Sequence, residues 1–339
     1  MCTTFSLYLT GTKNPHQISA RTMDFERDLQ TKVKIIPAGQ SFPDLENLPS
    51  KNPLKWVNKY GYVGMQCNLG VPTANAISDG MNEAGLAIAA LWLPDSQYPT
   101  SESATTPVIY NSCFTDWILG NFNSVPAIQA ALDTITVVNI NERFPVHIVL
   151  HYVIIDQAGN NLVVEFTNGQ MQTYTPDNGV MTNAPPYNYQ LVNLTNYNLS
   201  LTNAPQVVFG QEINGSGCYG MPGDFSPASR FVRATAYREA INNYTPKNTQ
   251  ELIGLTTRIL QNCLVPLGTI KSANDNSLDY TQWGVVRDQG ELVYYFFSTF
   301  NINLYALNLS QLDLTQGKPQ ILPLNQPDWV QVLVPNKAS

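Results

Sequence analysis

Apolar and polar positions near the N-terminus follow the spacing of β-strands. Residues 17–25 alternate loosely between the two kinds, and residues 32–36 also have the character of a strand. Residues 85–92 form a continuous apolar run of strand length, as expected of a strand buried on both faces. Residues 82–85, just before it, have the composition of a turn. The N-terminal part is therefore predicted to be rich in strands.

The middle of the chain predicts helices followed by a hairpin. Residues 110–121 and 124–134 look like two short helices, and Ser124 is a plausible N-cap of the second. Residues 147–155 and 162–166 are rich in β-forming residues and are joined by a short loop that contains glycine. Such a pair predicts a β-hairpin.

Helical spacing returns at residues 229–242 and 249–264, and a last hairpin is predicted over residues 280–300. Strands, then helices, then strands, with hairpin rather than crossover connections, indicate antiparallel sheets covered by helices. Repeated strand-helix-strand units are missing, which argues against a doubly wound parallel fold. Without an internal repeat or a long linker, residues 2–339 are predicted to form one α+β domain.

Composition narrows the possible partners. Charged residues make up 13% of the 339 residues, and the net charge is −7. A nucleic-acid-binding protein needs a basic face, so this class is not expected. No apolar run has the length of a membrane-spanning helix, so no membrane partner is expected. The N-terminus lacks the features of a secretory signal, which predicts a cytoplasmic protein, or a periplasmic or secreted one if a signal peptide has been removed.

Cysteine and histidine patterns point away from metals and disulfides. The five cysteines are odd in number and include no Cys-x-x-Cys pair, so neither a disulfide framework nor a zinc site is indicated. His147 and His151 lie four residues apart, but their surroundings are strand-like, and two ordinary strand histidines are the favoured interpretation. No metal or cofactor is expected.

Cys2 is a candidate nucleophile because of its position. No histidine lies in a recognisable context as a partner base for a thiol. A cysteine that becomes the first residue after loss of Met1 would supply its own base, because a free α-amino group has an ordinary pKa of about 7.7–8. The thiol is then only a few bonds from that base. Taken alone, a cysteine at position 2 is also compatible with chance.

Three further segments carry polar residues in suggestive places. Arg21 and Asp24 lie three apart near the end of a predicted strand, and Asn183 stands in a turn bounded by proline. A loop rich in Gly and Pro over residues 219–229 leads to Arg230 in the first turn of a predicted helix. Read separately, these features are also compatible with a salt bridge, a turn and a helix cap.

Together the motifs resemble the choloylglycine hydrolase and penicillin V acylase family, whose members are N-terminal nucleophile hydrolases. The order and approximate spacing match from residue 2 to about residue 300. The matching segments are Cys2, the Arg-x-x-Asp at residues 21–24, the Asp-Gly-Met-Asn-Glu-x-Gly-Leu at residues 79–86, the Thr-Asn-x-Pro at residues 182–185 and the Pro-Gly-Asp-Phe-Ser-Pro-Ala-Ser-Arg-Phe at residues 222–231.

The resemblance implies a four-layer αββα sandwich of two antiparallel sheets and hydrolysis of linear amides. Cys2 would attack the carbonyl while its α-amino group moves the proton. Arg21 would favour the thiolate, and Asp24 would hold the amine. Asn183 would direct its side-chain N–H at the developing oxyanion, and Arg230 would complete the polar cluster.

One departure from the family pattern concerns specificity. Members that hydrolyse bile salts typically carry Asn where this chain has Trp92, and Phe25 adds a second ring. Members similar to penicillin V acylase, including a Gram-negative type that accepts long-chain acyl homoserine lactones, tend to be aromatic here. The expected substrate is therefore an amide with an apolar acyl group. A core position for Trp92 is the alternative.

Two other functions stay open at this stage. A conjugated bile salt hydrolase would use the same machinery with a different pocket, and a catalytically silent β-rich binding protein would use none of it. The stretch from Asn183 to Arg230 is long enough for an extended loop, similar to the one with which relatives build tetramers. A homotetramer is therefore expected.

Overall fold

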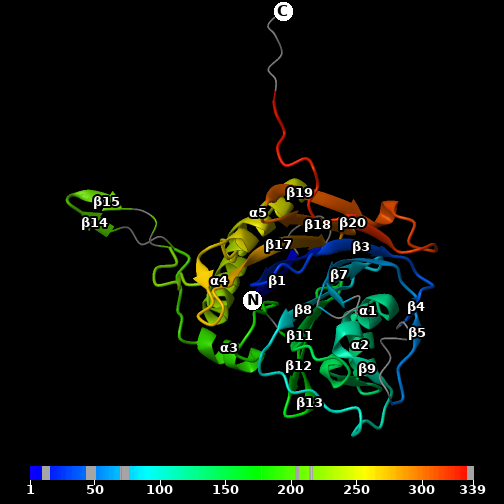
Figure 1. Ribbon diagram of the computed structural model, residues 1–339. Coiled ribbons are helices and arrows are strands. Elements are labelled where there is room, and N and C mark those ends of the chain that lie inside the picture. Colours follow the sequence, from blue (N-terminus) through cyan, green and yellow to red (C-terminus); the bar gives the residue numbers. More distant parts are fainter. Residues whose placement is uncertain are drawn as a thin grey trace, which may run out of the picture.

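The computed structural model describes residues 1–9, 16–42, 51–68, 70, 76–176, 178–202, 206–213, 215 and 217–333. Two large antiparallel sheets lie face to face, and helices cover the outer side of each (Figure 1). The predicted α+β class and its sandwich of two antiparallel sheets are confirmed.

The first sheet has the strand order β1-β2-β17-β18-β19, with β16 paired to β17. Its strands are β1 (Cys2–Leu9), β2 (His16–Phe25), β16 (Ile270–Lys271), β17 (Leu278–Asp288), β18 (Val293–Ser298) and β19 (Asn301–Asn308). Helices α4 (Pro227–Ala240) and α5 (Thr249–Gln261) cover it through contacts with β1, β2 and β17.

The second sheet has eight strands in the order β13-β12-β11-β8-β7-β6-β3-β20. They are β3 (Lys32–Ile36), β6 (Tyr62–Cys67), β7 (Ala76–Asn82), β8 (Ala87–Trp92), β11 (Leu150–Ile155), β12 (Asn161–Thr167), β13 (Gln170–Tyr174) and β20 (Gln320–Pro323). Helix α1 (Asn111–Asn121) packs on β7 and β8, and α2 (Val125–Leu132) belongs to the same outer layer (Figure 1).

Smaller elements complete the described chain. They are helix α3 (Tyr187–Leu194), the pairs β4 (Ser41–Phe42) with β5 (Trp56–Val57), β9 (Val108–Tyr110) with β10 (Thr136–Val138), and β14 (Gln206–Val208) with β15 (Gln211–Ile213). Three 3₁₀ turns, η2 (Ile140–Glu142), η3 (Ile241–Asn243) and η4 (Leu309–Gln311), also occur in these described parts.

The hairpin of β14 and β15 projects away from the body of the molecule (Figure 1). Phe209 stands at its turn with a fully exposed side chain, and Val207 is 72% exposed. The hairpin lies in the stretch expected to form an extended loop. The homotetramer itself stays a prediction.

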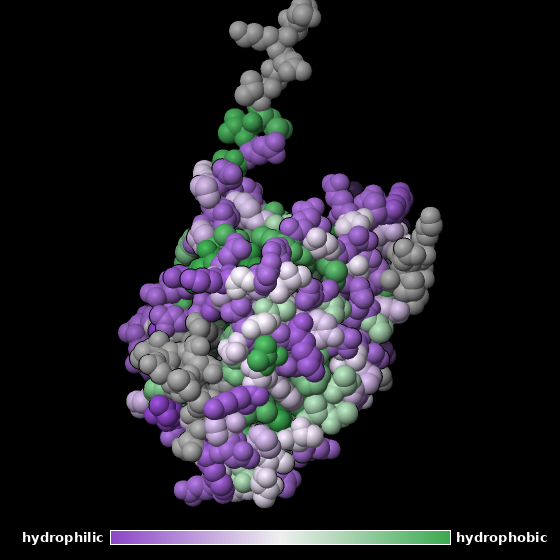
Figure 2. Space-filling view, turned by 90° about the vertical axis from the view of Figure 1, so that its right-hand side faces the viewer, coloured by the Kyte–Doolittle hydropathy of each residue, from purple (hydrophilic) through white to green (hydrophobic). Residues whose placement is uncertain are grey.

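The C-terminal segment also stands off the body, and hydrophobic side chains gather below its base (Figure 2). The exposed large apolar residues of β19 and the turn before it are Phe300, Ile302 and Leu304.

Two sequence expectations need correction. The hairpin strand predicted from residue 147 begins at Leu150, so His147 is an exposed residue before the strand and only His151 is a strand histidine. Ser124 does occupy the N-cap position of α2, but its side chain makes no capping bond. The Val125 N–H instead donates to Asp156 at 2.9 Å, so a distant loop carboxylate caps this helix.

A buried carboxylate joins the two sheets. Asp79 on β7 accepts hydrogen bonds from Arg287 on β17 at 3.0 Å and from Tyr294 on β18 at 2.8 Å. The guanidinium of Arg21 on β2 lies 3.5 Å from the same carboxylate, and all four side chains are fully buried. Two cations of the first sheet therefore depend on one anion of the second.

We predict that Asp79→Asn lowers the free energy of unfolding by about 3–5 kcal/mol, because it leaves two buried guanidinium groups without their anion. Urea denaturation measures the loss. Asp133→Asn, at the exposed end of α2, is the matched control and should change stability by less than about 0.5 kcal/mol. Equal midpoints for the two variants would contradict the prediction.

Candidate active site

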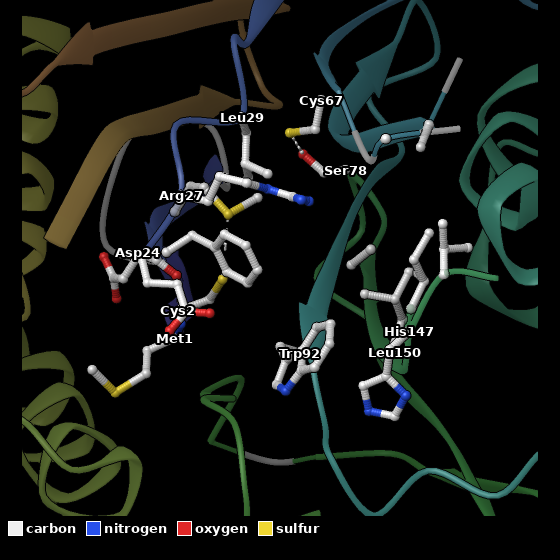
Figure 3. A pocket seen from close by; sticks show the side chains of 18 of the residues that line it. Met1, Cys2, Asp24, Arg27, Leu29, Cys67, Ser78, Trp92, His147 and Leu150 are labelled. Atoms are coloured by element: carbon white, nitrogen blue, oxygen red, sulfur yellow. Dashed lines mark hydrogen bonds between the residues drawn. The ribbon is translucent and has the colours of Figure 1, made fainter. Parts of the chain in front are cut away.

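A cavity of about 1010 Å³ opens between the two sheets. Figure 3 shows Cys2 and Asp24 on one wall, with Trp92 and His147 on the opposite wall. The first wall comes from β1 and β2, and Trp92 is the last residue of β8. Cys67 and Ser78 lie farther along the cavity, joined by a hydrogen bond between sulfur and hydroxyl of 3.1 Å. The cavity therefore has walls from both sheets.

The thiol of Cys2 lies beside a buried cation. Nη2 of Arg21 donates to Cys2 Sγ at 3.5 Å and to the carbonyl of Ala90 at 2.6 Å. Burial lowers the pKa of Arg21, but the neighbouring Cys2 and Asp79 outweigh burial and raise it above its ordinary value. Arg21 is therefore a permanent positive charge at the sulfur, which favours the thiolate form.

Arg230 and Asn183 hold the backbone of Cys2. Nη1 of Arg230 donates to the Cys2 carbonyl at 2.6 Å, and Nη2 donates to Asn183 Oδ1 at 3.0 Å. The same Oδ1 accepts the Cys2 N–H at 2.5 Å. Both ends of residue 2 are thus fixed by side chains that come from far along the sequence.

Local sequence explains how these two side chains are placed. Arg230 lies in the first turn of α4, where the Ser226 side chain caps the Ser229 N–H and Pro227 begins the helix. Behind Asn183, buried His151 contacts the Thr182 carbonyl through Nε2 at 2.9 Å and Glu165 through Nδ1 at 2.8 Å. The turn that carries Asn183 is therefore held from β11 and β12.

In the chain that carries Met1, the side chains of Asn183 and Asp24 bond other groups of the protein. Nδ2 of Asn183 donates to the Trp92 carbonyl at 2.8 Å, so one of its two N–H groups is already occupied. The carboxylate of Asp24 accepts from the hydroxyls of Thr22 at 3.2 Å and Thr281 at 2.5 Å, and not from the Cys2 nitrogen. With Met1 attached, Asn183 accepts the N–H of Cys2, and the role expected of Asp24, which concerns the free α-amine, stays a prediction.

Met1 extends the first sheet by one residue. The Asp24 N–H donates to the Met1 carbonyl at 2.8 Å, and the Met1 amino group donates to the Asp24 carbonyl. This pair continues the ladder in which Cys2 faces Met23. Met1 therefore covers the backbone of Asp24 beside the thiol.

Trp92 and Phe25 both line the cavity. Their ring centroids lie 6.0 Å apart, and the His147 ring meets Trp92 edge-on at 5.4 Å. Trp92 is only partly buried, unlike the other residues of β8. Its side chain is thus a cavity wall, and the core position considered as an alternative is not what the structure shows.

Comparisons with known proteins agree on one family. Residues 2–326 match the linear amide C–N hydrolases of the choloylglycine hydrolase family.

This chain belongs to the choloylglycine hydrolase family.

Family members with different names match this chain to similar extents. A bile salt hydrolase/transferase of Clostridium perfringens is 30% identical, covering 93% of this chain and 94% of its own. A penicillin V acylase of Pectobacterium atrosepticum is 28% identical, covering 92% and 82%.

Solved structures of the same two kinds share the fold. A mutant of the conjugated bile acid hydrolase from Clostridium perfringens has a TM-score of 0.81 at 26% identity, covering 96% of this chain and 97% of its own. The penicillin V acylase from Agrobacterium tumefaciens has a TM-score of 0.78 at 26% identity, covering 98% and 94%. The matches extend over nearly the whole chain and include both kinds of linear amide hydrolase.

Other features of the described chain concern metals and membranes. Among its described residues, no group of three or more His, Cys, Asp or Glu side chains is arranged to hold a metal ion. Within those same segments, no helix is both long and apolar enough to cross a membrane.

Sequence reasoning missed several cavity residues. Nothing in the sequence around Cys67 indicates a role, yet this buried free thiol lines the same cavity as Cys2. Asp279 also lines the cavity, and its carboxylate lies 3.9 Å from the Met1 amino group. No local motif marks either residue, because both reach the site through strand pairing over long sequence separations.

We predict that Cys2 of the Met1-free protein reacts with iodoacetamide at least about tenfold faster than Cys67 or Cys263 at pH 7.5. Burial raises the pKa of Cys67, and burial raises the pKa of Cys263 to about 11, so both stay as thiols at that pH. Peptide mass spectrometry at timed intervals gives the rates.

The same protein unfolded in urea is the control, in which the three thiols should react at similar rates. Faster labelling of Cys67 than of Cys2 in the folded protein would show that Arg21 does not activate the Cys2 sulfur.

Proposed function

We propose that this chain is an N-terminal cysteine amidohydrolase of the penicillin V acylase type, with an apolar acyl group as the preferred acyl half of its substrate. One observation carries the proposal. Cys2 lines a cavity with Arg21 at its sulfur, and Asn183 and Arg230 hold its backbone. Chemistry at the thiol needs only the loss of Met1 to free the α-amine.

In the proposed reaction, Cys2 Sγ attacks the substrate carbonyl and the thiol proton passes to the α-amino group. The amine then protonates the leaving nitrogen, the C–N bond breaks, and an acyl thioester forms on Cys2. Water hydrolyses this thioester and restores the thiol. Arg21 favours the attacking thiolate, and Asp24 takes over the free α-amine once Met1 is gone.

The developing oxyanion needs hydrogen-bond donors. The second N–H of the Asn183 amide is available for this role while the first stays on the Trp92 carbonyl. Arg230 donates to both Asn183 Oδ1 and the Cys2 carbonyl, so it fixes the position of the Asn183 amide relative to the nucleophile. Preorganised donors of this kind are typically worth about 3–4 kcal/mol in the transition state.

The aromatic wall supports the choice of acyl group. The Trp92 and Phe25 rings face the cavity beside the nucleophile, and they match a phenoxyacetyl group or the first carbons of a fatty acyl chain. Penicillin V and long-chain acyl homoserine lactones carry such groups. A conjugated bile salt hydrolase remains the second candidate, because the Clostridium perfringens relative at 30% identity is named a bile salt hydrolase/transferase.

We expect the Met1-free protein to hydrolyse penicillin V and a long-chain acyl homoserine lactone faster than a glycine- or taurine-conjugated bile salt. Cys2→Ala should lower kcat by about 10³-fold or more, because it removes the nucleophile. Cys218→Ala, in a loop outside the cavity, is the matched control and should retain activity.

Release of the amine product measures each rate, and a mass spectrum checks the loss of Met1. Turnover that survives Cys2→Ala would exclude Cys2 as the nucleophile. A preference for the bile salt would favour the second candidate.

We predict that Trp92→Asn raises kcat/KM for the bile salt relative to penicillin V by about tenfold, since it removes the apolar wall and adds a hydrogen-bonding amide. Trp329→Asn is the control, because this residue is 67% exposed and lies outside the cavity. An unchanged ratio in Trp92→Asn would assign the Trp92 ring to packing alone.

A further inference from the structure

We propose that the place occupied by Met1 becomes the site for the amine half of the substrate, and that it favours amines carrying an ammonium or hydroxyl close to the scissile nitrogen over amines carrying an anion there. This inference rests on the proposed function. It adds a preference for the leaving group to the preference for the acyl group. We define the Met1 niche as the Asp24 backbone together with Asp279.

Backbone pairing shows what the removal of Met1 uncovers. The Asp24 N–H donates to the Met1 carbonyl at 2.8 Å, and the Asp24 carbonyl accepts from the Met1 amino group. Both groups lose their partner when Met1 leaves. One donor and one acceptor are then exposed side by side at the cavity, in the geometry of a β-ladder.

The proton transfer places the leaving group in this niche. The α-amine of Cys2 must lie within hydrogen-bond reach of the leaving nitrogen in order to protonate it. Substituents on that nitrogen therefore extend from the neighbourhood of the Cys2 nitrogen, which is where the atoms of Met1 lie. The acyl half of the substrate then packs against the apolar wall of Trp92 and Phe25.

Charge in the niche selects among leaving groups. Asp279 Oδ2 lies 3.9 Å from the Met1 amino group, and Asp279 Oδ1 is a buried atom that has no hydrogen-bond partner among the described residues. Glu26 and Asp275 add negative charge to the cavity lining, against the exposed Arg27. The other two cations nearby, Arg21 and Arg230, are fully buried and already bonded to Cys2.

Met1 itself indicates the charge of the preferred group. Its amino group is a cation that lies near Asp279 and donates to the Asp24 carbonyl. An ethylenediamine amide carries an ammonium two carbons from its scissile nitrogen, and an ethanolamine amide carries a hydroxyl there. A glycine amide places carboxylate oxygens there, facing the Asp279 carboxylate.

Three phenoxyacetyl amides test the proposal, because they share an acyl group and differ only at this position. The amines are ethylenediamine, ethanolamine and glycine, with penicillin V as a reference. We expect wild-type kcat/KM to be highest for the ethylenediamine amide, lower for the ethanolamine amide and lowest for the glycine amide. In Asp279→Asn the ratio of the ethylenediamine amide to the glycine amide should drop about tenfold. Asp133→Asn, an exposed carboxylate on the outer helical layer, should leave the ratio unchanged.

A binding measurement separates this inference from the proposed function. Dissociation constants of the three amides for Met1-free Cys2→Ala protein report the charge preference without turnover. Cleavage of penicillin V with a wild-type preference for the glycine amide, or a ratio that Asp279→Asn does not change, would overturn the inference alone. Absence of Cys2-dependent turnover on all four amides would overturn the proposed function. Equal dissociation constants would then reject the niche as well.

Discussion

The site depends most on the two ion pairs that the Asp79 carboxylate forms with the guanidinium groups of Arg21 and Arg287. This carboxylate is buried between the facing sheets, and it comes from β7 while both cations come from the opposite sheet. A buried guanidinium needs an anion nearby. The sheets therefore cannot slide or separate without leaving buried guanidinium charges unpaired. Arg21 also donates a hydrogen bond to the Cys2 sulfur, so its position relative to Asp79 sets its position relative to the thiol. The charge beside the thiol is therefore fixed by the same contact that joins the layers.

Much of the fold could be predicted from local pattern. The strands at residues 32–36 and 85–92 and the two C-terminal helices follow from apolar spacing alone, with shifts of a few residues at their ends. The sequence prediction was wrong where contacts between residues far apart in the sequence determine the local structure. His147 lies outside the strand although its neighbours are β-forming, and its ring packs on Trp92 instead. The cap of α2 comes from Asp156, which no rule of local capping could indicate.

The candidate site shows the same division. The motifs around Cys2, Arg21, Asp24, Asn183 and Arg230 predicted which side chains would gather, and the structure brings the five together. Their bonding partners could not be predicted. The Asn183 side chain accepts a hydrogen bond from Cys2 and donates one to a main-chain carbonyl of β8. This pairing depends on how the two sheets face each other. Spacing along a chain contains no information about that approach.

The contact between Asn183 and residue 92 has a consequence for divergence within the family. Asn183 bonds the main-chain carbonyl of Trp92, and Arg21 likewise bonds the main-chain carbonyl of Ala90. Main-chain carbonyls are present whatever the side chain is. The strand that shapes the pocket can therefore accept new side chains through mutation while it continues to anchor the polar cluster. An arrangement of this kind lets substrate range drift over evolutionary time without rebuilding the reactive centre.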